Sequence, residues 1–405
     1  MSISNKLEVA ENKEWDDRWT RRFDFFGLAT WLVLGLYLAG ISLVFYGEDF
    51  RGYYAAARVL LGGGNPYDYH QVAQVLLEIT GKMGNNPYYY PPWFTWFFIS
   101  LTTLPFQMAR AVWMMFNLII WDLGLWNLRN ILDVPFNGWR LYMLYALATF
   151  SFAWITWRYE QAGILIFVIL VAVLKTIKNQ QWSWAGFWMA LSLIKPNITL
   201  IVVLGLTVWL IRQRYWRPVL IMGLWLIGLT AISTLITPDW YQPLFEERFG
   251  QGLNVVLDGP DKVVALRLIT TMLDWLRTLG IEGRLKLVIY GVVAVAGIMI
   301  FLITIWNSAS LLQVMSISLL VSYTLTPYAM QYDNPSLFIV VFWALSLCLV
   351  SRRAMRIGIL LAGFVFSVIF WQQNISWAYW MVVGSVALAA WAMFQSNRSP
   401  DQFMS

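Results

Sequence analysis

One aspartate stands where it could act on a substrate. Asp49 comes just after a long apolar run, about 25–46, and it opens a stretch with helical periodicity from about Phe50 to Leu61. An aspartate that opens a helix commonly caps it, because its carboxylate accepts hydrogen bonds from free backbone N–H groups. The alternative is a general base that takes a proton from a substrate hydroxyl. Position alone favours the cap.

Two cations lie near the ends of other apolar runs. Lys195 stands beside Pro196 in the turn between two such runs, where an unpaired ammonium is costly, so a functional role is one interpretation. The other is a lysine whose amine reaches the interface and only marks it. Arg158 lies two residues from Glu160, and these side chains could form a simple structural ion pair.

The composition is that of a membrane protein. Of the 405 residues, 59% are hydrophobic and 12% are charged, whereas soluble domains carry about 25% charged residues. A single cysteine and a single histidine exclude an intrachain disulfide and a metal site built from several such residues. The net charge of +6 comes from Lys and Arg clustered in short loops, which indicates topology and gives no reason to expect a nucleic-acid partner.

Recurring apolar runs predict an all-α polytopic membrane protein with about twelve transmembrane helices. Several runs are near the lower length limit for a span, so we expect them to pack inside the bundle or to thin the bilayer. The predicted spans are about 25–46, 107–127, 141–157, 162–174, 182–195, 197–211, 218–237, 287–306, 311–326, 335–350, 357–372 and 377–394.

The loop charges predict the orientation. If the segment 91–105 does not cross and the N-terminus is cytoplasmic, the loops rich in Lys and Arg all lie inside. We therefore expect 91–105 to be a juxtamembrane or re-entrant helix, and 263–279 to be an amphipathic helix in the interface. The expected parts are a cytoplasmic segment 1–24 without a cleavable signal peptide, a single transmembrane domain 25–394 with outer loops at about 47–106 and 238–286, and a cytoplasmic tail 395–405.

Short motifs recur along the chain in a fixed order. They are Asp49-Phe50 with Tyr53 and Ala56, Gly64-Asn65-Pro66-Tyr67-Asp68, Tyr88-Tyr89-Tyr90-Pro91-Pro92, Glu160-Gln161, Ile194-Lys195-Pro196, and Thr326-Pro327-Tyr328-Ala329-Met330-Gln331-Tyr332-Asp333. This ordered set resembles glycosyltransferase family 87, whose members have the GT-C membrane fold. The chain departs from the family's pattern at Glu160, where the family often has glycine, and it has no histidine near Asp333.

The resemblance implies a GT-C-like bundle that transfers a sugar from a polyprenyl phosphate donor to a hydroxyl of a glycolipid or glycan on the outer face of the plasma membrane. It assigns the catalytic base to Asp49. One carboxylate is enough, because phosphate is a good leaving group and needs no acid, unlike the leaving group of a glycoside hydrolase. Attack opposite to the phosphate inverts the anomeric centre. Mannose is the first sugar to expect, arabinofuranose is an alternative, and no cofactor is expected.

The resemblance also implies roles for further residues. Lys195 and Arg158 are expected to hold the donor phosphate as its charge develops. The predicted topology puts Asp49, Glu160, Lys195 and Asp333 on one face of the membrane. The residues expected to bind substrate are Tyr53, Tyr67, Asp68, His70, Tyr90, Glu160, Gln161, Tyr332 and Asp333.

Other interpretations stay open. Tyr90 could belong to the aromatic belt, His70 could be an ordinary loop residue, and Asp333 could cap a helix that begins near Pro335. Several carboxylates could converge on a divalent ion, but no recognised spacing supports a metal site. The competing functions are a transporter or lipid flippase and a non-catalytic scaffold. Transporters place polar groups near the midplane, often within internal repeats; candidates at one face and no evident repeat favour an interfacial enzyme.

Overall fold

Every regular element that the structure describes is a helix. Within the described ranges there is no strand, which confirms the all-α prediction. The predicted spans 25–46 and 357–372, the first part of the span 141–157, and residues 263–270 of the predicted interfacial helix lie outside these ranges. The computed structural model describes residues 49–81, 88–132, 148–238, 240–241, 271–307, 310–326, 328–348 and 380–396.

Two helices follow Asp49 in the first predicted outer loop. α2 (Phe50–Leu61) has the bounds that its periodicity predicts, and the glycine run ends it, with Gly63 in the left-handed region at φ 77°. α3 (Tyr69–Thr80) begins after its N-cap Asp68 and ends at Gly81, which is also left-handed at φ 68°. Glycine suits such helix ends because it has no Cβ.

The segment 91–105 forms a short helix and not a span. α4 (Pro92–Ile99) starts with a proline, which fits the first turn because no N–H is needed there. It continues into the 3-10 helix η1 (Ser100–Thr103). Together they are too short to cross a bilayer, in agreement with the expected juxtamembrane or re-entrant segment. The chain then enters the long helix α5 (Phe106–Leu132).

The remaining helices form the body of the molecule. In the middle of the chain they are the π-helical turn η2 (Thr149–Ala153), α7 (Trp154–Tyr159), α8 (Gly163–Lys178), α9 (Trp182–Ser192), α10 (Pro196–Arg212) and α11 (Trp216–Ile236). Toward the C-terminus they are α13 (Met272–Thr278), α14 (Gly283–Asn307), α15 (Leu311–Leu325), the 3-10 helix η5 (Gln331–Ser336), α16 (Leu337–Cys348) and α18 (Trp380–Ser396).

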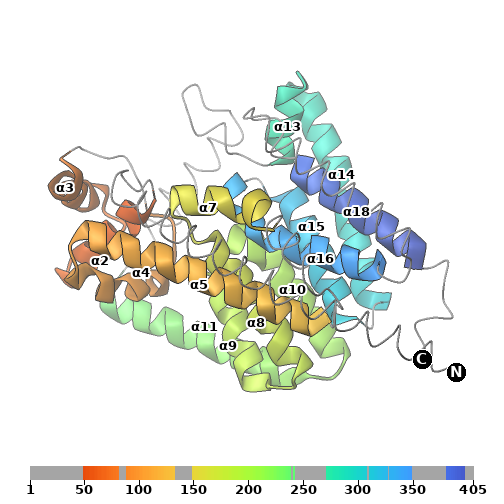
Figure 1. Cartoon of the computed structure of the whole chain (residues 1–405), viewed down its shortest axis with the longest axis horizontal. Helices are drawn as coiled ribbons and strands as arrows, with labels where there is room; N and C mark the ends of the chain where they lie inside the picture. Colours follow the sequence, from red (N-terminus) through yellow and green to blue (C-terminus); the bar gives the residue numbers. More distant parts are fainter. Residues whose placement is uncertain are drawn as a thin grey trace, which may run out of the picture.

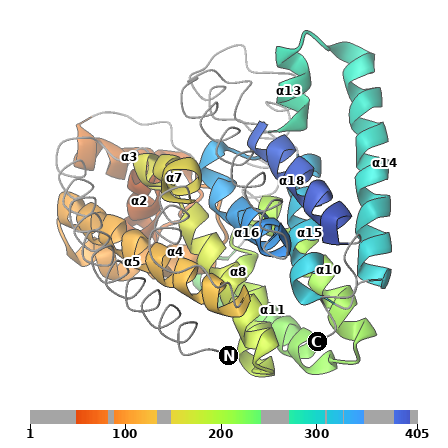
Figure 2. The same cartoon turned by 45° about the vertical axis from the view of Figure 1, so that its right-hand side comes forward.

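The helices form two flanks around a central group. Figures 1 and 2 show α2 to α5 on one side of the molecule and α13, α14 and α18 on the other, with α8, α10, α15 and α16 between them. In the central group α10 packs against α15, and α8 packs against both α5 and α9. The continuous apolar core therefore joins helices that are far apart in sequence.

Three described helices are long and apolar enough to cross a membrane, by length and composition: Phe106–Ile131, Trp216–Ile236 and Gly283–Asn307. In the most apolar window of α11, and likewise of α14, only 6% of the residues are buried inside the protein. Such surfaces are stable against lipid and not against water. The larger number of about twelve spans is not confirmed and stays a prediction.

Several helix ends meet at one end of the central group. α8, α10 and α16 begin there and α15 ends there, so the turns that join them lie close together. The start of α8 touches η5 so closely that a Cβ at Gly163 would overlap with the carbonyl of Tyr332. The hydroxyl of Thr156 donates to the same carbonyl at 2.8 Å. These contacts fix the turn after α7 against η5.

Candidate active site

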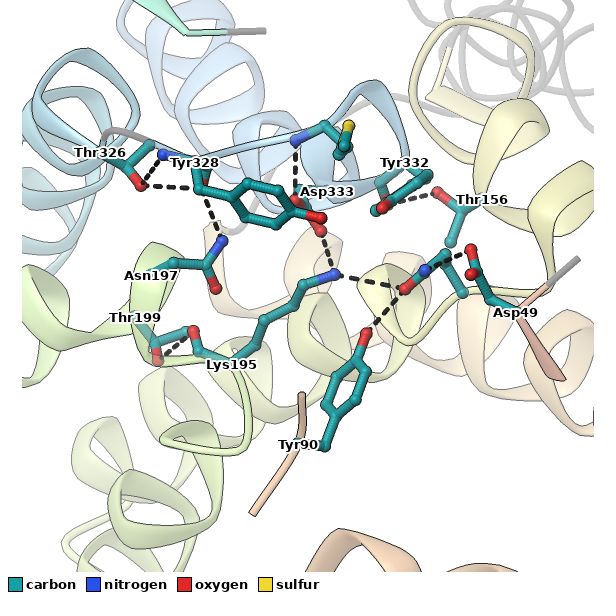
Figure 3. Close-up of polar contacts among 12 residues, drawn as sticks. Asp49, Tyr90, Thr156, Lys195, Asn197, Thr199, Thr326, Tyr328, Tyr332 and Asp333 are labelled. Carbon is teal, nitrogen blue, oxygen red and sulfur yellow. Dashed lines mark hydrogen bonds and ion pairs between the residues drawn. The ribbon is translucent and has the colours of Figure 1, made fainter. Parts of the chain in front are cut away.

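Asp49 occupies the N-cap position of α2, but its side chain does not cap the helix. Its Oδ2 accepts a hydrogen bond from Nε2 of Gln161 instead. Its backbone N–H donates to the carbonyl of Tyr159 at 3.3 Å. Both partners belong to the turn between α7 and α8, so the carboxylate faces the polar cluster in Figure 3. The capping interpretation therefore does not describe this aspartate.

Gln161 connects Asp49 to the far side of the cluster. Its Oε1 lies 2.9 Å from the Tyr53 hydroxyl and 2.7 Å from the Tyr90 hydroxyl. The same oxygen lies 3.4 Å from Nζ of Lys195. These donors fix the amide, with its oxygen toward the hydroxyls and the ammonium and its nitrogen toward the carboxylate. Burial raises the pKa of the Tyr53 and Tyr90 phenols, so both are neutral donors at neutral pH.

Lys195, directly before α10, forms a buried ion pair with Oδ1 of Asp333. Burial lowers the pKa of the Lys195 amine, but the Asp333 carboxylate and the side chains of Tyr90 and Tyr328 together raise it more, so the net pKa lies above its usual range. The amine is therefore cationic at neutral pH. It also lies 5.7 Å and 5.0 Å from the ring centroids of Tyr90 and Tyr332. A snorkelling lysine reaches water, and this one does not.

Asp333 has two partners at once. Its Oδ2 accepts the backbone N–H of Met330 at 3.0 Å and so caps η5, while Oδ1 faces the ammonium of Lys195. Asp333 is the third residue of η5, so it stabilises the first turn of η5 and is not the N-cap of a helix that begins near Pro335. With Asp49 and Lys195 in the same cluster, the structure brings together three of the four charged residues that the predicted topology put on one face, as Figure 3 shows. The fourth, Glu160, is in a separate ion pair.

Arg110 and Glu160, the residue directly before Gln161, form a second buried ion pair. Nε of Arg110 on α5 is 3.0 and 3.1 Å from the two carboxylate oxygens of Glu160, and the two side chains are 1% and 2% exposed. Glu160 is left-handed at φ 58°, which costs a residue with a Cβ about 1–2 kcal/mol. The expected partner, Arg158, has an exposed side chain in the last turn of α7.

Sequence reasoning missed Arg110 and Asn197. Arg110 lies inside the predicted span 107–127, and a charged residue within a span is itself a signal of a buried partner or a site. Asn197 follows Pro196 on α10 and donates from Nδ2 to the carbonyl of Tyr328 at 2.8 Å. That bond ties the start of α10 to the segment before η5. An asparagine in the first turn of a predicted helix gave no comparable signal.

Three residues expected to bind substrate make other contacts. The buried Tyr67 donates from its hydroxyl to the carbonyl of Tyr90 at 2.6 Å, so it supports the segment that carries Tyr90. Asp68 caps α3 by accepting the backbone N–H of His70 and of Gln71 at 2.8 and 3.3 Å. The side chain of His70 is exposed. The structure thus places Asp68 and His70 in the local structure of α3 and outside the cluster around Gln161.

The cluster combines groups that can accept a proton and hold an anion. The Asp49 carboxylate is a proton acceptor, the Lys195 ammonium is an anion ligand, and the tyrosine rings can contact a sugar face. Within the described residues, no group of three or more His, Cys, Asp and Glu side chains could hold a metal ion. Independence from metals stays a prediction.

The comparisons with known proteins give one match. The profile of glycosyltransferase family 87 matches residues 88–330, which is more than half of the chain. The matched range contains Tyr90, Gln161 and Lys195; it begins after Asp49 and ends before Asp333. No curated protein and no solved structure is significantly similar to the chain.

Proposed function

Because the chain belongs to glycosyltransferase family 87, we propose that it is an inverting transferase that moves a sugar from polyprenyl phosphate to a hydroxyl acceptor on the outer face of the plasma membrane. The family implies glycosyltransferase activity, and the apolar helices indicate a membrane protein. Our proposal adds the donor lipid, the stereochemistry, the membrane face and mannose as the first sugar to test.

One observation carries the proposal: Asp49 and Lys195 contact opposite ends of the same amide, that of Gln161. A primary amide is short, so a proton acceptor and a cation lie within reach of a single substrate. Glycosyl transfer from a phosphate needs this pair of functions, a base for the acceptor hydroxyl and a cation for the departing phosphate. A second carboxylic acid is not required, because the phosphate leaves without being protonated.

Lys195 is the phosphate ligand in this proposal. Its ammonium is buried and cationic, and its partner Asp333 keeps the charge balanced in the absence of donor. A donor phosphate would share the ammonium with Asp333. The seventeen-residue helix α10 begins directly after Lys195, and the positive end of its dipole favours an anion at this place. Arg158 is exposed on α7, so we expect it to make only a secondary contact with the phosphate.

The reaction then follows from the positions of the two charges. The acceptor hydroxyl gives its proton to Asp49 as its oxygen attacks the anomeric carbon. The bond from that carbon to the phosphate oxygen breaks, and the electron pair leaves with the polyprenyl phosphate, whose charge Lys195 stabilises. Attack from the side opposite to the phosphate inverts the anomeric centre. Asp49 finally releases its proton to water.

The exposed apolar helices support a lipid-linked donor over a soluble one. α11 and α14 offer long surfaces that suit lipid, and a prenyl chain stays in the bilayer for the same physical reason. The polar cluster lies at the ends of α8, α10, α15 and α16, where a lipid headgroup would meet it. A transporter would place such groups along the middle of its helices.

The test is a transfer assay with the purified protein in lipid. We would offer polyprenyl phosphates that carry mannose, arabinofuranose or glucose, together with a lipid extract as the acceptor, and measure free polyprenyl phosphate and the anomeric configuration of the product. Glu78→Gln is the matched control for Asp49→Asn, because Glu78 is an exposed carboxylate in the same loop. Release in wild type and Glu78→Gln, but not in Asp49→Asn, with an inverted product supports the proposal. A retained configuration contradicts it.

A further inference from the structure

We propose that the buried ion pair between Arg110 and Glu160 is a positioning device that directs the Gln161 amide, and through it the Asp49 carboxylate, toward the acceptor hydroxyl. The inference rests on the proposed function, since it takes Asp49 as the base. It concerns two almost fully buried side chains, one of which belongs to the residue directly before Gln161.

The backbone at Glu160 needs support from its surroundings. Its φ and ψ are 58° and 33°, a left-handed conformation that residues with a Cβ disfavour. The N–H groups of Glu160 and Gln161 donate to the carbonyls of Trp157 and Thr156, each at 3.0 Å. These bonds involve only backbone atoms, and a glycine would form them without strain. A contact made by the glutamate side chain can offset this strain, and a glycine would have neither the strain nor the contact.

α5 holds residue 160 at two points. The guanidinium of Arg110 contacts both carboxylate oxygens of Glu160, and Nε1 of Trp113 donates to the Glu160 carbonyl at 2.9 Å. Arg110 and Trp113 are three residues apart, so they project from the same face of α5. A planar guanidinium bound to both oxygens of a carboxylate leaves little freedom of rotation. The side chain and the carbonyl of residue 160 are thus fixed together.

The neighbours of Glu160 are the residues that hold Asp49. The carbonyl of Tyr159 accepts the Asp49 backbone N–H, and the side chain of Gln161 donates to the Asp49 carboxylate. Residue 160 lies between these two partners in the chain. A change in its φ and ψ would move both of them relative to α2, so the ion pair controls the backbone and the side chain of the base together.

Gln161 is a positioning residue and not a substrate ligand. Its oxygen has two lone pairs, and three donors from Tyr53, Tyr90 and Lys195 already surround it. The residue is 5% exposed. Its N–H donor stabilises the ionised form of the Asp49 carboxylate, which is the form that accepts a proton. An amide displaced by the loss of the ion pair would leave the carboxylate easier to protonate.

The test uses the full chain in lipid with polyprenyl-phosphate mannose as donor. Arg110→Gln and Glu160→Gln should each lower kcat about tenfold or more, leave the donor KM within about threefold, and move the acidic limb of the rate profile to higher pH. The double variant Glu160→Gln/Gln161→Leu should lose no more than Gln161→Leu alone, since both changes act through one amide. Asp274→Asn, which breaks the ion pair with Arg277 at 3.3 Å, is the control and should leave the limb in place.

Two results overturn the positioning role. One is a lower kcat with an unmoved acidic limb, and the other is a double variant whose loss equals the product of the single losses. If Arg110→Gln does not fold, Arg110→Lys keeps the charge without the two-point contact and should move the limb in the same direction by less.

A wild type that transfers no sugar from any donor contradicts the proposed function instead. The inference is then decided by infrared titration of the carboxylate at position 49, with the Asp49→Asn form of each protein as its blank. Titration at higher pH in Arg110→Gln than in wild type supports the positioning role, and titration at the same pH overturns it.

Discussion

The starts of α2 and α3 look alike in sequence and differ in their contacts. Both helices begin at an aspartate in the first predicted outer loop. Asp68 accepts the backbone N–H groups of His70 and Gln71, at 2.8 and 3.3 Å, and so caps α3. Asp49 holds the same position before α2 but makes no capping hydrogen bond. Its carboxylate accepts from Gln161, 112 residues further along the chain.

The difference separates a carboxylate used for folding from one available for chemistry. A capping carboxylate that took a proton would lose hydrogen bonds from its own helix, so Asp68 is unsuited to act as a base. Asp49 is held by a distant segment, and α2 does not depend on its side chain for a cap. We infer that a carboxylate at a helix start becomes a candidate base when its hydrogen bonds come from elsewhere in the fold.

The largest expected effect comes from the start of α2. Asp49→Asn removes the proton acceptor and keeps the size of the side chain, so kcat should fall by roughly 10²–10⁴. Asp68→Asn should keep kcat within about twofold, because it changes only a cap. Steady-state transfer from polyprenyl-phosphate mannose measures both variants. Equal losses in the two would break the comparison.

Loss of the cation should be the next largest effect. Lys195→Met removes the ligand of the departing phosphate and should lower kcat by roughly 10²–10³. It also leaves Asp333 buried without its cation, so Lys195→Met/Asp333→Asn is measured beside it to keep the charge balanced. Thermal unfolding in detergent separates stability from activity. A charge-balanced variant with wild-type kcat would remove Lys195 from the reaction.

A smaller effect is expected at Tyr53. Tyr53→Phe removes one hydroxyl from the Gln161 oxygen and should lower kcat about 2–10-fold, the range for one neutral hydrogen bond. The matched control is Tyr54→Phe on the same helix, since the Tyr54 hydroxyl donates to the carbonyl of Leu104 at 2.8 Å, away from the cluster. The ratio of the two kcat values reports on the hydroxyl network alone. A ratio near one would mean that the network does not support the base.

The smallest expected effect on activity, and the clearest on local stability, comes from Asp68. Burial raises the pKa of its carboxyl, but hydrogen bonds from the backbone of Gln71 and His70 and from the Gln71 side chain together lower it more, so the net pKa lies below its usual value. The cap is therefore fully present above the unfolded-state pKa and is lost as the pH falls through the folded pKa. Asp68→Asn should cost α3 about 1 kcal/mol or less. Hydrogen exchange of the α3 amides measures this, and protection of α3 that does not depend on the pH or on the variant would contradict the assignment.

Local sequence patterns predicted where the helices lie in the chain better than they predicted which side chains of different helices are in contact. Periodicity and the following glycines placed α2 at Phe50–Leu61. Loop charges placed Asp49, Lys195 and Asp333 on one side, and the structure brings them into one cluster. The pairing of Glu160 could not be predicted in the same way, because a left-handed backbone turns its carboxylate toward Arg110 on α5. Asp68 and His70 belong to a local capping motif that the sequence alone could not separate from a site.

The rate profile of sugar transfer against pH tests most directly whether Asp49 takes the proton. Wild-type protein in lipid should lose activity on acidification as a single carboxylate is protonated. Asp49→Asn should keep only a low residual rate, and that rate should not change with pH over the same range. An Asp49→Asn profile that keeps the acidic limb of the wild type would contradict the account, because another group would then accept the proton.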